Sequence, residues 1–183
     1  MKETPETWTR KQSEEVADCR VFKVREDFCE RDSDAKTASF FVVETPDWVN
    51  IIAVTKDEQV VLIEQFRHGS EEIILEIPGG MLDDGEDAET AAKRELLEET
   101  GYSSDEFVYL GKSRPNPAIQ NNWIYHYAAL NSEKTADTAF DEHESVVTKL
   151  VPLVEIESLV ESGEITHSLA IVGFYYLNLS NKI

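Results

Sequence analysis

Three glutamates in the middle of the chain have a spacing that could support metal chemistry. Glu95, Glu98 and Glu99 are three and four residues apart, so they would share one face of a helix. Arg94 can compensate Glu98, but one guanidinium does not neutralise three carboxylates. Because hard divalent cations such as Mg²⁺ prefer oxygen ligands, we expect a cation between these side chains. A solvated, Glu-rich surface would show the same charges, so the spacing alone leaves both interpretations open.

The segments around these glutamates indicate how they are positioned. Residues 86–100 have a helical apolar period, and Gly101 is placed to end the helix in a left-handed conformation. The apolar run Ile73–Ile77 predicts a short strand, closed by a turn at residues 78–80. A Gly79-Gly80 turn can offer a backbone carbonyl without obstruction by a side chain.

The residues from Gly80 to Tyr102 resemble a known family signature. Glu86 follows Gly80 after five residues, and seven residues later comes the run Arg94-Glu95-Leu96-Leu97-Glu98-Glu99-Thr100-Gly101-Tyr102. This pattern is similar to the Nudix box of the Nudix hydrolases at every defining position. Only Tyr102 departs from it, being aromatic where an aliphatic residue is usual. Seven fixed identities at roughly 6% usage each arise by chance on the order of 10⁻⁹ per window.

The resemblance implies a fold, a reaction and a set of site residues. The fold is α/β, the Nudix α/β/α sandwich with a mixed sheet, together with an N-terminal β-strand extension. The reaction is Mg²⁺-dependent hydrolysis, with Mn²⁺ as a substitute, of a diphosphate that links a nucleoside to another group. The resemblance implies that Arg94 and Glu98 are catalytic residues. In it, Arg94 orients the box carboxylates by a charge-assisted pair. The implied metal-site residues are the Gly79 carbonyl, Glu86, Glu95, Glu98 and Glu99.

Three features outside the box resemble the ADP-ribose pyrophosphatase and nucleotide-sugar hydrolase branch. Pro117 lies fifteen residues beyond Tyr102, a spacing that the resemblance associates with ADP-ribose hydrolysis. The acidic run 141–144 is similar to the loop that supplies the catalytic base, and Glu142 matches the base better than Glu144. The run 61–67 resembles a substrate-binding strand, with Arg67 and Glu64 as the binding residues.

Each of these features also has an ordinary structural interpretation. Pro117 could simply shape a loop, since proline is common in loops. Glu142 and Glu144 could be solvated loop carboxylates, and Arg67 could pair only with surface acids. The predicted activity is therefore hydrolysis of ADP-ribose and related nucleoside diphosphate sugars to NMP and a sugar phosphate. The alternatives are a nucleoside triphosphate or dinucleotide (NADH-type) pyrophosphatase and a non-catalytic nucleotide-binding sensor.

The rest of the chain suggests two regions. Residues 1–45 are predicted to form an N-terminal arm and strands, with 1–15 loosely held, and residues 46–183 the hydrolase domain. A hairpin is predicted from residues 48–55 and 59–66, further strands at 107–110, 123–130 and 146–152, and helices at 152–162 and 165–179. The resemblance implies a homodimer in which residues 17–45 are exchanged between subunits.

Composition restricts the partners and the compartment. The 183 residues include 37 acidic and 17 basic ones, for a net charge of −20. Such a surface repels nucleic acid and anionic membranes, so we expect neither as a partner, and an anionic substrate must be held through a cation. No stretch approaches about 18 apolar residues, and the N-terminus does not have the pattern of a secretory signal. With Cys19 and Cys29 as reduced thiols, we expect a cytoplasmic protein.

Overall fold

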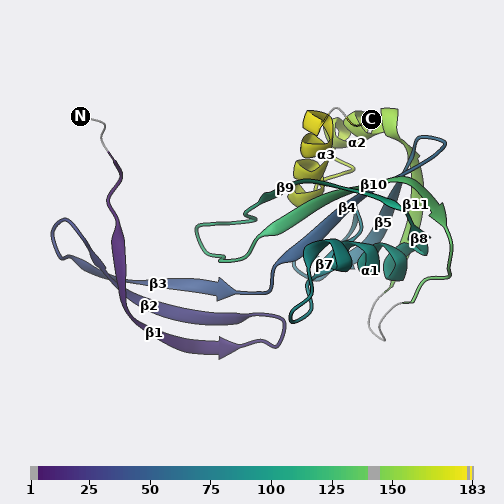
Figure 1. Cartoon of the computed structure of the whole chain (residues 1–183). Coiled ribbons are helices and arrows are strands. Elements are labelled where there is room, and N and C mark those ends of the chain that lie inside the picture. Colours follow the sequence, from purple (N-terminus) through teal and green to yellow (C-terminus); the bar gives the residue numbers. More distant parts are fainter. Residues whose placement is uncertain (1–3, 140–144, 181, 183) are drawn as a thin grey trace. The chain divides into compact units, whose positions relative to one another are not determined.

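The computed structural model describes residues 4–139, 145–180 and 182. They divide into two compact units, which we describe separately. The first unit contains the chain up to Pro46 and returns with Arg114–Asn122. The second unit contains Asp47–Ser113 and the chain from Trp123 onward, and it holds the whole Nudix-like segment (Figure 1).

The first unit is built on a three-stranded antiparallel sheet in the order β1-β2-β3. The strands are β1 (Trp8–Asp18), β2 (Lys23–Arg31) and β3 (Thr37–Glu44). The expectation of a loosely held arm over residues 1–15 is wrong from Trp8 onward, because β1 pairs with β2 along its length. Side chains support this pairing, as the Ser13 hydroxyl donates to the Asp27 carboxylate over 2.6 Å. Because most residues of β1 are polar, this strand shows no alternation of apolar residues from which it could be predicted.

The second unit contains an eight-stranded mixed sheet with the main path β11-β5-β4-β10-β8. β6 adds to β5, β7 adds to β4, and β9 adds to β10. Strands β4 and β10 run parallel, and the other pairs are antiparallel. The strands are β4 (Trp48–Thr55), β5 (Gln59–Arg67), β6 (Glu72–Glu76), β7 (Gly79–Met81), β8 (Tyr102–Ser103), β9 (Glu106–Ser113), β10 (Ile124–Lys134) and β11 (Val146–Pro152).

Helices cover both faces of this sheet (Figure 1). The helix α1 (Ala88–Thr100) packs Ala91, Ala92 and Leu96 against one face. On the other face lie α2 (Ile156–Ser162), preceded by the short 3₁₀ turn η1 (Leu153–Glu155), and α3 (Ser168–Ser180). Two apolar cores therefore flank the sheet, which confirms the predicted α/β/α arrangement.

The predicted 48–55/59–66 hairpin is confirmed by the antiparallel pairing of β4 with β5. The predicted turn at Gly79-Gly80 is wrong, because both glycines pair with β4 as part of β7. The predicted helix begins two residues later than expected, at Ala88. Within the described residues, the structure has no helix of the length and apolarity needed to cross a membrane.

Candidate active site

The helix α1 is fixed at both ends by its own sequence. Asp87 caps its N-terminus, and the carboxylate accepts hydrogen bonds from the backbone N–H groups of Glu89 and Thr90, both at 3.1 Å. At the other end Gly101 adopts φ 74°, and its N–H donates to the Leu97 carbonyl. A side chain would be strained at that left-handed φ, so the predicted role of Gly101 is confirmed. These caps define where α1 begins and ends, and the burial of its apolar side chains against the sheet sets the face that carries the glutamates.

The two glycines of β7 allow the strand to approach its neighbours closely. A Cβ on Gly80 would lie 2.3 Å from Glu95 Oε1, so only glycine leaves room for that carboxylate in its present position. A Cβ on Gly79 would lie 2.3 Å from the Val49 carbonyl oxygen on β4. The absence of a side chain, rather than the turn that we expected, explains both glycines.

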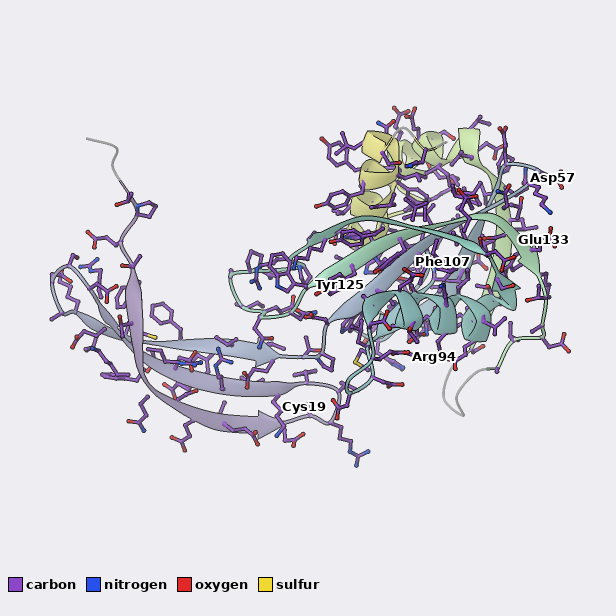
Figure 2. The ribbon with its side chains drawn as sticks, in the orientation of Figure 1. Cys19, Asp57, Arg94, Phe107, Tyr125 and Glu133 are labelled. Carbon is purple, nitrogen blue, oxygen red and sulfur yellow. The ribbon has the colours of Figure 1, made fainter. Side chains whose placement is uncertain are left out.

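Arg94 connects the carboxylates of the box to one another (Figure 2 shows its place on α1). Its Nε and Nη2 donate to the two oxygens of Glu86 over 3.1 and 2.9 Å. Nη1 donates to Glu95 Oε1 at 2.8 Å and to Glu98 Oε2 at 3.2 Å. Nη2 also donates to the Met81 carbonyl oxygen at 3.0 Å, which ties the helix to β7. The helical spacing predicted the Arg94–Glu98 pair, whereas the contacts with Glu86 and Met81 also require the chain to turn back on itself before the helix.

The charges of this cluster reinforce one another. Hydrogen bonds to Glu86 are the main reason that the pKa of the Arg94 guanidinium is raised above its ordinary value. The same bonds from Arg94 are the largest cause that lowers the pKa of Glu86, with the Asp83 backbone N–H as a further donor. Glu86 is therefore a charged carboxylate held in place, at the entrance of the helix.

Glu99 is the most buried of the box glutamates, with 6% of its surface exposed. Its Oε2 accepts a hydrogen bond from the Gly79 backbone N–H at 2.9 Å. This bond joins the last turn of α1 to the start of β7, twenty residues earlier in the chain. The backbone of Gly79 and the carboxylate of Glu99 are thus neighbours, as the proposed metal site requires.

The chemistry of this donor set fits a hard divalent cation. Glu86, Glu95, Glu98 and Glu99 together contribute four carboxylates, and Arg94 supplies one positive charge. The excess negative charge and the all-oxygen donors are what Mg²⁺ or Mn²⁺ would bind. In the part of the chain that the structure describes, no three acidic, His or Cys side chains converge as a ready-made metal site. In this structure Glu86, Glu95 and Glu98 are instead held by Arg94.

The two predicted substrate-binding residues of β5 have different surroundings. Arg67 donates from Nε to Glu76 Oε1 over 2.7 Å. Glu64 instead pairs with Lys149 at 3.3 Å. Because side chains alternate along a strand, Glu64 shares the face of Leu62, beneath α2 and α3, and Arg67 projects from the other face. The structure does not bring Arg67 and Glu64 together.

The remaining predicted residues lie outside this cluster. Pro117 belongs to the first unit, in the segment 114–122, where the Val43 N–H donates to the Ile119 carbonyl at 2.7 Å. Glu142 and Glu144 fall outside the described residues. Sequence reasoning also passed over Glu76, a buried carboxylate at the end of β6. The signal that could have identified Glu76 is a single charge inside the apolar run 73–77.

Comparison with known proteins identifies the family. The model of the NUDIX domain matches residues 45–169. The methanol dehydrogenase activator of Bacillus methanolicus is 31% identical over 172 residues, which cover 93% of this chain and 92% of that protein. The ADP-ribose pyrophosphatase of Bacillus subtilis (strain 168) is 30% identical over 151 residues, 82% of each protein.

A solved structure with a similar fold supports the same family. A crystal structure of an ADP compounds hydrolase superposes with a TM-score of 0.86 and covers 98% of this chain and 97% of its own, at 23% identity. That match concerns the fold, and it agrees with the α/β/α arrangement of the second unit. The family model, the curated relatives and the box geometry lead to one conclusion: the chain belongs to the Nudix hydrolase family, in the branch of the ADP-ribose pyrophosphatases.

Proposed function

We propose that this protein hydrolyses the diphosphate of ADP-ribose and related nucleoside diphosphate sugars, and that it releases NMP and a sugar phosphate. The observation that carries the proposal is the cluster in which Glu86, Glu95 and Glu98 surround Arg94, with Glu99 bound to the start of β7. The similarity to an ADP-ribose pyrophosphatase over 82% of the chain supports the choice of substrate.

Mg²⁺, or Mn²⁺ in its place, would be held by Glu86, Glu95, Glu98, Glu99 and the Gly79 carbonyl. When bound, the cation would neutralise the diphosphate and lower the pKa of the attacking water. The residues of the chain hold the geometry: Arg94 fixes the carboxylates before substrate arrives, and Asp87 and Gly101 fix the helix that carries them. The acidic protein thereby binds an anionic substrate through a cation.

The proton of the attacking water requires an acceptor. We assign that role to Glu142, with Glu144 as the second candidate. Water oxygen bonds to one phosphorus, the bridging P–O bond breaks, and the carboxylate takes the proton. The variants Glu142→Gln and Glu144→Gln separate the two: the base variant loses kcat and the acidic limb of its pH profile, and the other keeps both.

Arg67 and Pro117 are the further residues that we propose for substrate binding, each considered within its own unit. Arg67 would contact the diphosphate through its guanidinium, and Pro117 would shape the loop that recognises the rest of the ligand. Glu64 is the weakest of the three assignments, because its carboxylate pairs with Lys149 on the opposite face of β5. A Glu64→Gln variant with an unchanged KM removes it from the site.

The proposed homodimer is supported by the first unit. Its sheet leaves aromatic side chains exposed on both faces, which the second subunit of the proposed dimer would cover. Phe28 (44% exposed) and Phe41 (56%) share one face by the strand register, and Phe40 (43%) with Trp8 lies on the other. Light scattering on the full chain should give twice the monomer mass, and Phe41→Ser should lower it. A monomeric wild-type protein would contradict the dimer.

A substrate panel tests the activity. ADP-ribose, GDP-mannose, UDP-glucose, NADH and dATP are each incubated with the protein and Mg²⁺, with and without EDTA, and the products are separated. EDTA-sensitive release of AMP from ADP-ribose alone supports the proposal in its narrow form, and similar turnover of several sugars makes the protein a broad nucleotide-sugar hydrolase. Preference for NADH or dATP would replace the proposed substrate class. Tight ligand binding without turnover would support a sensor.

Two free cysteines are consistent with the proposed cytoplasmic location.

A further inference from the structure

The buried carboxylate of Glu76 has two basic partners. Glu76 ends β6 and is 1% exposed. A buried carboxylate is stable in its charged form only when it is paired and hydrogen-bonded. Its Oε1 accepts from Arg67 Nε at 2.7 Å, and its Oε2 lies 2.8 Å from His167 Nδ1. Burial raises the pKa of Glu76, but the hydrogen bonds and charge interactions with His167 and Arg67 together outweigh it and leave that pKa lowered.

Arg67 is held by one edge of its guanidinium. The bond to Glu76 uses Nε, and the side chain is 37% exposed. Within residues 4–139, 145–180 and 182, no hydrogen bond from the two terminal nitrogens of Arg67 is found. A guanidinium is planar, so fixing Nε also fixes the plane in which the terminal donors lie. That pair of donors matches two oxygens of a phosphate or diphosphate.

His167 keeps the carboxylate from rotating. It precedes α3, and its carbonyl oxygen accepts from the N–H groups of Ala170 and Ile171 at 3.0 and 3.1 Å. The first turn of α3 therefore fixes the backbone of His167. With one oxygen bound to His167 and the other to Arg67, the Glu76 carboxylate has a defined orientation.

We propose that Glu76 is a positioning residue, which holds Arg67 so that its two terminal amino groups are presented to the substrate diphosphate, with His167 as its second anchor. This inference rests on the proposed function, because it takes Arg67 as the residue that contacts the diphosphate. Preorganisation of this kind reduces the loss of rotamer freedom when the ligand binds. Neither Glu76 nor His167 touches the substrate in this arrangement.

Steady-state kinetics with ADP-ribose test the role. Glu76→Gln should raise KM about tenfold and change kcat by less than about twofold, because a lost ground-state contact acts equally on the transition state. Glu72→Gln is the matched control: Glu72 is exposed, lies opposite Arg67 in the strand register, and makes no hydrogen bond to it in the described residues. Its KM should equal that of the wild type.

A double-mutant cycle separates positioning from mere structural support. If Glu76 acts through Arg67, the variant Arg67→Ala/Glu76→Gln has the KM of Arg67→Ala alone. The inference would be overturned if the effects of the two substitutions on KM were additive in the double variant. A loss of kcat in Glu76→Gln as large as that in the double variant would also overturn it. His167 is partly exposed, and His167→Ala removes the second anchor of Glu76, so this variant should raise KM about threefold. His167→Gln should return KM to the wild-type value, because its amide can donate to Glu76.

A measurement without turnover distinguishes this inference from the proposed function. In ¹⁵N NMR spectra the Arg67 Nε–H proton should exchange slowly in the wild type and at least about tenfold faster in Glu76→Gln. Fast exchange in the wild type would refute the anchoring. If that proton is protected but no compound of the panel is hydrolysed, the proposed function fails and the anchoring stands, without its role in hydrolysis. If ADP-ribose is hydrolysed and Glu76→Gln leaves KM unchanged, the positioning role alone fails.

Discussion

The backbone N–H of Gly79 donates a hydrogen bond to Oε2 of Glu99 over 2.9 Å. One side chain thus joins the last turn of the box helix to β7, the strand in which the box begins. Because the bond needs only an acceptor oxygen, the fold and the negative charge at this position can be separated by substitution.

Glu99→Gln should therefore abolish activity and keep the fold. The amide oxygen can still accept from Gly79, but the charge needed by a cation is gone, so kcat should fall by about 100-fold or more. Kinetics and thermal unfolding measure the two effects. Glu89→Gln, an exposed position on the same helix, is the control and should keep full activity. A wild-type rate in Glu99→Gln would refute the metal assignment.

Gly79→Ala and Gly80→Ala should fail in different ways. In Gly79→Ala the new Cβ meets a backbone oxygen of Val49, which cannot move away, and we expect a loss of about 2 kcal/mol in unfolding free energy. In Gly80→Ala the three atoms nearest to the new Cβ all belong to the carboxylate of Glu95, which can rotate. That variant should keep its stability but lose activity by about 100-fold, since misplaced catalytic groups are costly.

Urea unfolding and kinetics on both glycine variants give the comparison. Gly69→Ala is the control, because a Cβ there would have no atom within 4 Å. Equal stability of Gly79→Ala and Gly80→Ala would contradict the predicted difference.

Arg94→Lys should destabilise the box and reduce activity together. Lysine keeps the charge but cannot donate at once to Glu86, Glu98 and the Met81 carbonyl as the guanidinium does. We expect a loss of about 2 kcal/mol in unfolding free energy, together with a lower kcat. Lys93→Gln removes an exposed neighbouring cation and should change neither. An unchanged unfolding free energy in Arg94→Lys would show that the hydrogen bonds of the guanidinium contribute little to stability.

Removal of the cation should stop the reaction without unfolding the protein. Because Glu86, Glu95 and Glu98 each accept a hydrogen bond from Arg94, the box keeps these contacts when metal is absent. EDTA should abolish product release, and excess Mg²⁺ should restore it, while the far-UV circular dichroism spectrum and the melting temperature stay nearly constant. Full activity after exhaustive chelation, or unfolding by EDTA, would contradict this expectation.

His126 should make the protein less stable in mild acid. Its side chain is fully buried, and desolvation lowers its pKa from 6.5 to about 4. The unfolded chain takes up a proton below pH 6.5, which the folded chain resists, so stability is complete above that pH and falls as the pH drops toward 4. The effect should reach about 3 kcal/mol.

Urea unfolding of wild type and His126→Gln at pH 7.5 and pH 4.5 isolates this contribution. The variant should lose less stability over this range than the wild type, because carboxylates that titrate there are common to both proteins. His68→Gln, at an exposed position, should behave like the wild type. Identical pH dependence of His126→Gln and the wild type would refute the assignment.

The local features of the site could be predicted from the order of the residues alone. The helix, its Gly101 cap and the shared face of Glu95, Glu98 and Glu99 follow from residue spacing within one segment, because i to i+4 contacts depend only on helical geometry. The β4–β5 hairpin and the α/β class also follow from local patterns and the Nudix resemblance. Strand β1 did not, since polar strands carry no hydrophobic alternation.

The contacts between residues far apart in the chain could not be predicted in this way. Arg94 reaches Met81, Gly79 reaches Glu99, and Glu76 joins Arg67 to His167, one hundred residues further along the chain. No spacing rule connects such pairs, because their separation depends on how strands and helices pack rather than on the helical or strand repeat. The chemistry could therefore be predicted from one segment of the sequence. The contacts that orient its side chains form only when the sheet and helices pack together.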